Sequence, residues 1–180
     1  MKAIVLHRNG GPDVLRCEEI ETPRPEPGEV LVRVRAAGVN HVDIDIRNGL
    51  SGMKGNFPHI PGVDAAGVVA EVGDGVTTWK AGDRVAPHFI LSCGVCQNCL
   101  KGAENMCHNF GILGATTWGT YAEYVKVGQH HLVRLPNGLS FDDAVSSYVP
   151  FATAWEALVT VGKVGPGETV LVNAAGSGVG

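Results

Sequence analysis

Hydrophobic and polar residues alternate in short runs along the first two thirds of the chain, a pattern typical of β-strands. The clearest run is 29–36, where valines at every second position share one face and two arginines lie on the other. Strands are predicted over residues 2–6, 15–20, 29–36, 65–72, 84–87, 121–127 and 131–134, and a short helix over 42–48. Turn residues separate these runs, so the pattern predicts a small, barrel-like domain that is mainly β.

The pattern becomes helical near residue 139. Ser140, followed three residues later by Asp143, is typical of a helix N-terminus and predicts a helix that runs to about Tyr148. Apolar residues at helical spacing predict a second helix over 151–161. A turn and an apolar strand over 169–172 are expected after it.

The glycine-rich loop over 173–180 permits two interpretations. A strand that leads into such a loop opens a dinucleotide-binding βαβ unit, in which backbone N–H groups approach a pyrophosphate. Gly176, Gly178 and Gly180 are spaced G-x-G-x-G, however, rather than G-x-G-x-x-G. On spacing alone, a flexible glycine tail is an equally good interpretation.

Composition narrows the class of protein. With 180 residues, 44% hydrophobic and 18% charged, the chain can form the core of one ordinary domain and a small piece of a second. The net charge of −4 argues against a nucleic-acid binder. No apolar run approaches the roughly 18–20 residues that cross a bilayer, and the N-terminus lacks the features of a signal peptide. A cytoplasmic location, without nucleic-acid or membrane partners, is therefore expected.

Four of the five cysteines form a cluster spaced C-x2-C-x2-C-x7-C: Cys93, Cys96, Cys99 and Cys107. Thiolates at this spacing can surround a tetrahedral zinc ion, and Gly94 and Gly102 permit the turns that direct the sulfurs inward. Four thiolates close the coordination shell, so we expect one structural zinc per chain and not a catalytic one. Four free thiols and an iron–sulfur centre are the alternatives. Cys17 stands apart and is expected to be an ordinary strand residue.

These features, in this order, make the whole chain resemble the medium-chain dehydrogenase/reductase superfamily, which contains zinc-type alcohol dehydrogenases and quinone oxidoreductases. The matching stretches are MKAIVLHRNGGPDVL, PRPEPGEVLVRVRAAGVNHVD, FPHIPGVDAAGVVAEVG, GDRV, CGVCQNCLKGAENMC, GTYAEYV, TAWEAL and GETVLVNAAGSGVG. The resemblance implies a GroES-like catalytic domain over 1–150, with a zinc lobe at about 92–108. Over 151–180 it implies a linking helix and the first strand and glycine-rich loop of an incomplete Rossmann domain, so that the chain is a fragment of a longer enzyme.

The chain departs from the resemblance at the catalytic zinc. The three positions that ligate this metal in zinc alcohol dehydrogenases correspond here to Asn40, Val63 and Val149, and two of these side chains cannot ligate anything. Val42 stands at the proton-relay position and Asp64 at that of a glutamate. The resemblance therefore narrows to the zinc-independent quinone oxidoreductases. It implies an NAD- or NADP-dependent reductase of quinones or enones that has a structural zinc and lacks a catalytic one.

Candidate site residues follow from this resemblance. Without a metal, a hydrogen-bond donor must polarise the substrate carbonyl, and the amide of Asn40 is the first candidate. Asp43 and Arg47 are expected to orient it or to set the charge of the pocket; an ordinary surface ion pair is the alternative. The resemblance places Thr153 beside the nicotinamide. It also implies a pyrophosphate turn formed by Ala175, Gly176, Ser177, Gly178 and Gly180.

Two other functions stay open. The first is a zinc alcohol dehydrogenase whose catalytic metal is held by non-standard ligands such as His41, Asp64 or His88. The second is a GroES-like zinc module that binds a partner and does not catalyse. The resemblance implies a small carbonyl, enone, quinone or alcohol as substrate and allows a homo-oligomer, and the 180 residues alone are expected to be inactive.

Overall fold

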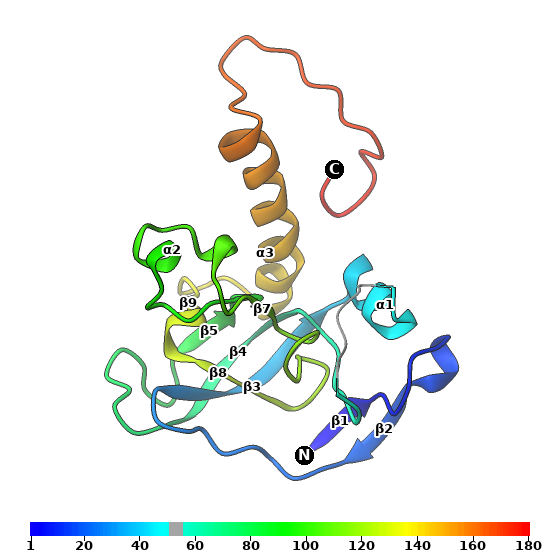
Figure 1. Ribbon diagram of the computed structural model, residues 1–180, viewed down its shortest axis with the longest axis vertical. Coiled ribbons are helices and arrows are strands. Elements are labelled where there is room, and N and C mark those ends of the chain that lie inside the picture. The colour runs from blue at the N-terminus through cyan, green and yellow to red at the C-terminus, as the bar shows by residue number, and fades with distance from the viewer. Residues whose placement is uncertain (51–55) are drawn as a thin grey trace.

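The computed structural model describes residues 1–50 and 56–180, and its centre is a curled antiparallel sheet (Figure 1). Its five strands lie in the order β8 (Tyr124–Gly128), β3 (Glu29–Gly38), β4 (Asp64–Val72), β5 (Arg84–Pro87) and β9 (Leu132–Arg134). The long strand β3 pairs with both β4 and β8, and its register with β4 shifts twice. Such irregularities bend a strand and help a sheet to curl. The predicted barrel-like β domain is confirmed.

Two smaller sheets flank the central one. β1 (Lys2–Val5) pairs with β2 (Arg16–Glu19), and Ala3 connects this pair to Ala122 through an isolated bridge. β6 (Ile90–Leu91) pairs with β7 (Gly111–Ile112). The segment that contains the four clustered cysteines leaves the domain at β6 and returns at β7, so this short ladder closes the base of a separate lobe.

The core of the domain consists mainly of valines from the central sheet. Val30, Val32 and Val85 have no exposed surface, and they form one cluster with Val69, Trp79, Leu113, Val125, Val127 and Leu132. Burial of such side chains is the main driving force for folding, at about 1.5–3 kcal/mol for each large apolar residue. The valines that sequence alternation assigns to one face of β3 therefore do face the core.

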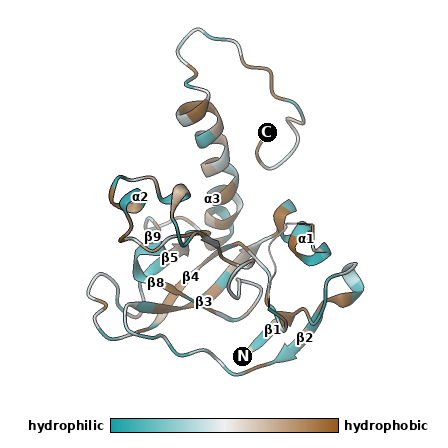
Figure 2. Ribbon diagram, in the orientation of Figure 1, coloured by the Kyte–Doolittle hydropathy of each residue, from teal (hydrophilic) through white to brown (hydrophobic). Residues whose placement is uncertain are grey.

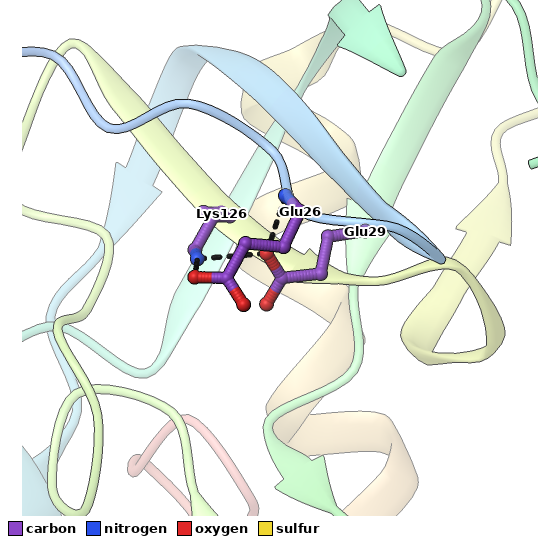
Figure 3. Close-up of polar contacts among 3 residues, drawn as sticks. All are labelled: Glu26, Glu29 and Lys126. Carbon is purple, nitrogen blue, oxygen red and sulfur yellow. Dashed lines mark hydrogen bonds and ion pairs between the residues drawn. The ribbon is translucent and has the colours of Figure 1, made fainter. Parts of the chain in front are cut away.

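A small ion-pair cluster attaches the proline-rich segment 21–28 to the edge of the sheet (Figure 3). The Nζ atom of Lys126 on β8 lies 2.7 Å from the Glu29 carboxylate on β3 and 3.3 Å from that of Glu26. The backbone N–H of Glu26 also donates to Glu29 Oε2 at 2.9 Å. The cluster thereby fixes the point at which the extended segment enters β3.

The described residues form the α-helices α1 (His41–Asn48), α2 (Gln97–Leu100) and α3 (Phe141–Trp155). The predicted N-terminus of α3 is confirmed, because Ser140 Oγ accepts a hydrogen bond from the Asp143 N–H at 3.0 Å. The predicted division into two helices is wrong: α3 passes through Pro150 and continues as a π-helical turn over Glu156–Val161. Proline has no N–H, so the helix lacks one backbone hydrogen-bond donor at this position. α3 thus crosses position 150, and the expected domain boundary there stays a prediction.

The predicted strand over 169–172 is also wrong, because this segment is irregular. A strand needs a neighbour for its backbone N–H and C=O groups, and none of the described strands lies beside these residues. The C-terminal half of α3 extends beyond the sheet (Figure 2). It carries exposed apolar side chains, with Phe151 70% and Trp155 65% exposed. Within the described residues, no helix is long and apolar enough to span a membrane.

Candidate functional site

The four clustered cysteines converge in the lobe between β6 and β7. Their Sγ atoms all lie within 4.8 Å of one another. Cys96 Sγ lies 3.4 Å from Cys99 Sγ and 4.0 Å from Cys107 Sγ, and Cys93 and Cys107 are 3.6 Å apart. Four sulfurs at about 2.3 Å from a tetrahedral zinc are separated by about 3.8 Å. The thiols are therefore spaced as one ligand set, and the site fits zinc.

Local backbone geometry directs these thiols inward. Cys96 precedes the single turn of α2, which carries Cys99. Gly94 and Gly102 both have positive φ, +71° and +75°, at the two tight turns where the sequence analysis expects them. The side-chain amide of Asn98 donates to the Met106 carbonyl at 2.6 Å and joins the two halves of the lobe.

Backbone N–H groups also set the acidity of the thiols. The N–H groups of Cys99 and His108 lower the pKa of Cys96 to about 6, and those of Val95 and Cys96 lower the pKa of Cys93. Burial, in contrast, raises the pKa of Cys99 to about 11. A zinc ion binds thiolates and displaces their protons, so it would complete the deprotonation of the set.

A second polar cluster is centred on the buried carboxylate of Asp43, which is 4% exposed. Its Oδ2 accepts hydrogen bonds from the Asn40 N–H at 2.8 Å and from the Tyr121 hydroxyl at 2.9 Å. Its Oδ1 accepts from the Val63 N–H at 3.1 Å. Burial raises the pKa of Asp43, although these three donors oppose the shift. The carboxylate therefore fixes the N-terminus of α1 against the segment that enters β4.

Asn40 caps α1 and presents its side-chain amide to a second acid. Asn40 Nδ2 donates to Asp64 Oδ2 at 3.5 Å, a long hydrogen bond. Asp64 is 1% exposed, and among the described residues its Oδ1 has no hydrogen-bond partner. Burial raises the pKa of Asp64 to about 6, and the neighbouring Asp43 carboxylate acts in the same direction. Two buried acids, Asp43 and Asp64, thus lie next to Asn40, the residue predicted to polarise the substrate carbonyl.

A cavity of about 650 Å³ brings this cluster together with the glycine-rich loop. Asn40 and Asp64 line one side of it, α3 contributes Val145, Ser146 and Pro150, and the C-terminal loop contributes Ser177, Gly178 and Val179. In Figure 1 the C-terminal segment turns back from the far end of α3 toward α1. Two segments about 140 residues apart in the sequence therefore border one space.

Comparison with known proteins shows the family to which this chain belongs. A model of the alcohol dehydrogenase GroES-like domain matches residues 26–137. The chain belongs to this family. It is 39% identical over 177 residues to an alcohol dehydrogenase of Geobacillus stearothermophilus, covering 98% of this chain and 52% of that protein. It is 36% identical over 181 residues to a quinone oxidoreductase of Lama guanicoe, covering 100% of this chain and 47% of that protein.

Solved structures agree with this assignment of the GroES-like domain. A crystal structure of an NAD-dependent alcohol dehydrogenase superposes with a TM-score of 0.95 at 45% identity, covering 99% of this chain and 52% of that one. A quinone oxidoreductase from Pseudomonas syringae pv. Tomato DC3000 superposes with a TM-score of 0.80 at 32% identity, covering 99% and 46%. The chain spans about half the length of the relatives it matches.

The other candidate residues, Arg47, Thr153 and those of the C-terminal loop, make no hydrogen bond to the Asn40 side chain in the described structure. Arg47 donates from Nε to the Gly10 carbonyl at 3.1 Å, so it holds the end of α1 to the N-terminal loop and makes no hydrogen bond to Asn40. Thr153 is exposed on α3 and donates to the Val149 carbonyl at 2.8 Å. In the loop, the Ser177 N–H donates to the Ala174 carbonyl at 2.8 Å and the Gly180 N–H to Ser177 Oγ at 3.1 Å. Ala175, Gly176 and Gly180 belong to the same exposed segment.

The resemblance expects a catalytic zinc ligand at position 63, and the structure shows an apolar environment there. Val63 is buried against Ile46 and Ala115. Over residues 1–50 and 56–180, the four cysteines are the only group of three or more Cys, His, Asp or Glu whose ligand atoms converge. His41, Asp64 and His88 do not form such a group.

The sequence predicts Asp64 only as an alternative ligand of a catalytic zinc and not as a partner of Asn40. Its signal was an acidic residue inside the apolar run Val63–Ala66. A carboxylate in such a run must be buried near polar partners, and buried charged groups occur often at functional sites.

The zinc content provides the first test of the lobe. Protein purified without added metal is expected to contain one zinc per chain, because four thiolates complete one tetrahedral shell. The double variant Cys93→Ser with Cys96→Ser should contain none, while the control Cys17→Ser, which changes an exposed thiol outside the lobe, should keep it. Elemental analysis measures the ratio. One zinc that survives the double variant would point instead to a site outside the lobe.

The pH dependence of stability tests the burial of Asp64. Its pKa in the folded chain, about 6, lies above its ordinary value of 3.8, so ionisation opposes folding. The wild type should therefore lose stability relative to Asp64→Asn as the pH rises from 4 to 7, by up to about 3 kcal/mol. Thermal or urea unfolding at several pH values measures this difference. Asp45→Asn, on the more exposed side of α1, should show no such trend, and parallel curves for wild type and Asp64→Asn would contradict the shift.

Proposed function

We propose that the chain is the N-terminal part of an NAD- or NADP-dependent oxidoreductase that reduces a quinone or an enone, with one structural zinc and no catalytic zinc. The observation that carries this proposal is the cavity lined by Asn40, Asp64 and the glycine-rich loop. Asn40 stands at one position where the resemblance expects a catalytic zinc ligand, and Asp64 follows Val63, which stands at another. Such a site can polarise a carbonyl oxygen by hydrogen bonding instead of by a metal.

Zinc in the lobe would be held by Cys93, Cys96, Cys99 and Cys107. A shell of four thiolates leaves no position for substrate, so the metal would stabilise the lobe and take no part in the reaction. The lobe has little apolar core of its own, since Val95, Leu100 and Met106 are exposed. A metal cross-link therefore supplies the stability that packing does not.

The cofactor would be bound through the C-terminal loop. Ala175, Gly176, Ser177, Gly178 and Gly180 would surround the pyrophosphate with backbone N–H groups, and Thr153 would lie beside the nicotinamide. When bound, the dinucleotide supplies the hydride. Small residues suit this role because a backbone without large side chains permits close approach of a phosphate.

Asn40 would act directly on the substrate, while Asp43 and Arg47 would position it. The Asn40 amide can donate to a carbonyl oxygen as negative charge develops there. Asp43 fixes the backbone of Asn40 through a 2.8 Å hydrogen bond, and Arg47 fixes the far end of α1. The helix thus carries the amide on a rigid support.

A zinc-dependent alcohol dehydrogenase is the second candidate, because relatives of 39% and 45% identity have the name alcohol dehydrogenase. It would need catalytic zinc ligands other than Asn40, Val63 and Val149. A small carbonyl or alcohol would then be the substrate. For either enzyme we propose a cytoplasmic location, no nucleic-acid or membrane partner, and a homo-oligomer of the full-length protein.

The role of Asn40 can be tested in the full-length enzyme. Asn40→Ala should lower kcat on the best quinone or enone by about 10²–10³, the effect of removing one donor to an oxyanion. Steady-state kinetics measure this loss, and fluorescence titration should show unchanged cofactor affinity. Asn137→Ala, an exposed turn residue, is the matched control. An unaltered kcat for Asn40→Ala would assign carbonyl polarisation to another group.

Cofactor binding to the 180 residues alone is expected to be weak. A dinucleotide site needs the helix after the glycine loop and the strands beside it, and these 180 residues contain only the loop. Calorimetry with NADH and NADPH should therefore detect no tight binding, whereas the full-length enzyme should bind one of them. A micromolar dissociation constant for the 180-residue chain would contradict this expectation.

A further inference from the structure

Asp64 differs from the neighbouring acid Asp43 in what its oxygens contact. Both carboxyl groups are buried, at 1% and 4% exposure. Asp43 accepts three hydrogen bonds of 2.8–3.1 Å, two from backbone N–H groups and one from a hydroxyl. Asp64 accepts only one long side-chain hydrogen bond, at 3.5 Å from Asn40, and within the described parts of the chain its Oδ1 accepts none. Of the two acids, Asp64 alone lines the cavity with the glycine-rich loop.

This difference determines which chemical form each acid prefers. A buried carboxylate oxygen without a donor loses its hydration and gains nothing in return, whereas a protonated carboxyl group has an O–H that it can donate. Burial is the largest effect on Asp64 and favours its protonated form, and the charge of Asp43 on α1 acts in the same direction, whereas hydrogen bonding from the Asn40 amide and from the Val149 backbone opposes the shift. Tyr121, before β8, and Tyr148, on α3, also lie close enough for Asp64 to raise their pKa values. Asp64 is thus suited to hold a proton near neutral pH at the wall of the cavity.

We propose that Asp64 is the proton donor of the reaction, delivering its proton to the carbonyl oxygen that Asn40 polarises. This proposal rests on the proposed function. Hydride from a reduced nicotinamide dinucleotide forms a new C–H bond on the substrate, and the electron pair of the opened π bond moves to the carbonyl oxygen. The Asp64 O–H bond then breaks as an O–H bond forms on that oxygen. From an enone the product is an enol, and from a quinone it is the keto tautomer of the hydroquinone, which becomes the hydroquinone when water removes the proton from the reduced carbon and protonates the second oxygen. The dinucleotide is oxidised, and the Asp64 carboxylate regains a proton from water.

The pair of Tyr148 and His88 is a weaker candidate for this role. The Tyr148 hydroxyl lies 3.0 Å from His88 Nδ1, so these two groups are engaged with each other. Burial raises the pKa of Tyr148 to about 12, and neither residue is among those that line the cavity. Asp64 lines the cavity, and its buried Oδ1 has no hydrogen-bond partner among the described residues.

The decisive experiment compares Asp64→Asn with wild type in the full-length enzyme. Asparagine has the same shape but no carboxyl proton, so kcat should fall about 10²–10⁴-fold, the usual contribution of general acid catalysis. The wild-type kcat should decrease as the pH rises above about 6, and the variant should lack this decrease. Asp64→Glu should recover part of the activity, and the control Asp45→Asn should retain wild-type kcat. Cofactor affinity, measured by fluorescence, should stay within about twofold in each variant.

A spectroscopic measurement tests the same residue without turnover. In the 180-residue chain labelled with ¹³C, the side-chain carboxyl signal absent from Asp64→Asn should titrate near pH 6. An Asp64→Asn enzyme with wild-type kcat and pH profile would overturn the proposal while leaving the proposed function intact. Should Asp64→Asn not fold, a wild-type kcat that is constant between pH 5 and 8 would overturn it equally. A wild-type enzyme without activity on quinones or enones would refute the proposed function, and this proposal with it.

Discussion

The buried carboxylate of Asp43 holds together three parts of the chain that meet at the candidate site. It accepts hydrogen bonds from the N–H of Asn40, which is the N-cap of α1, from the N–H of Val63 before β4, and from the hydroxyl of Tyr121 before β8. A charge at 4% exposure is tolerated only when its oxygens are satisfied, so the three donors and the acid depend on one another. Because Asn40 is the N-cap of α1 and Asp64 is the first residue of β4, this one group determines where both cavity-lining side chains lie.

The two polar centres of the domain have different physical requirements. The cysteine lobe needs a metal, since four thiols within 4.8 Å of one another and few buried apolar residues make a poor core. The Asn40–Asp64 cluster needs burial, because an amide and a carboxyl group polarise a carbonyl effectively only where water is excluded. The two centres lie in different parts of the domain: the lobe is inserted between β6 and β7, which form a sheet of their own, while the cluster lies at the ends of β3 and β4 under α3.

Features that depend on neighbouring residues in the sequence were predicted correctly. The alternation in 29–36 predicted β3, the spacing of the cysteines predicted their convergence, and Ser140 predicted the start of α3. Features that depend on distant partners were not. The strand expected over 169–172 is absent because a strand needs a neighbour. The apolar run around Asp64 indicates that it is buried, but the partners of its carboxyl group come from other elements, such as Asn40 before α1.

X-ray absorption at the zinc edge of the full-length enzyme tests most directly whether metal is confined to the cysteine lobe. The spectrum averages over every zinc ion in the protein. If the Asn40–Asp64 cluster works without metal, the shell should contain four sulfurs at about 2.3 Å and nothing lighter. A shell that also contains nitrogen or oxygen at about 2.0–2.2 Å would contradict this, because it would require a second zinc held by side chains outside the lobe.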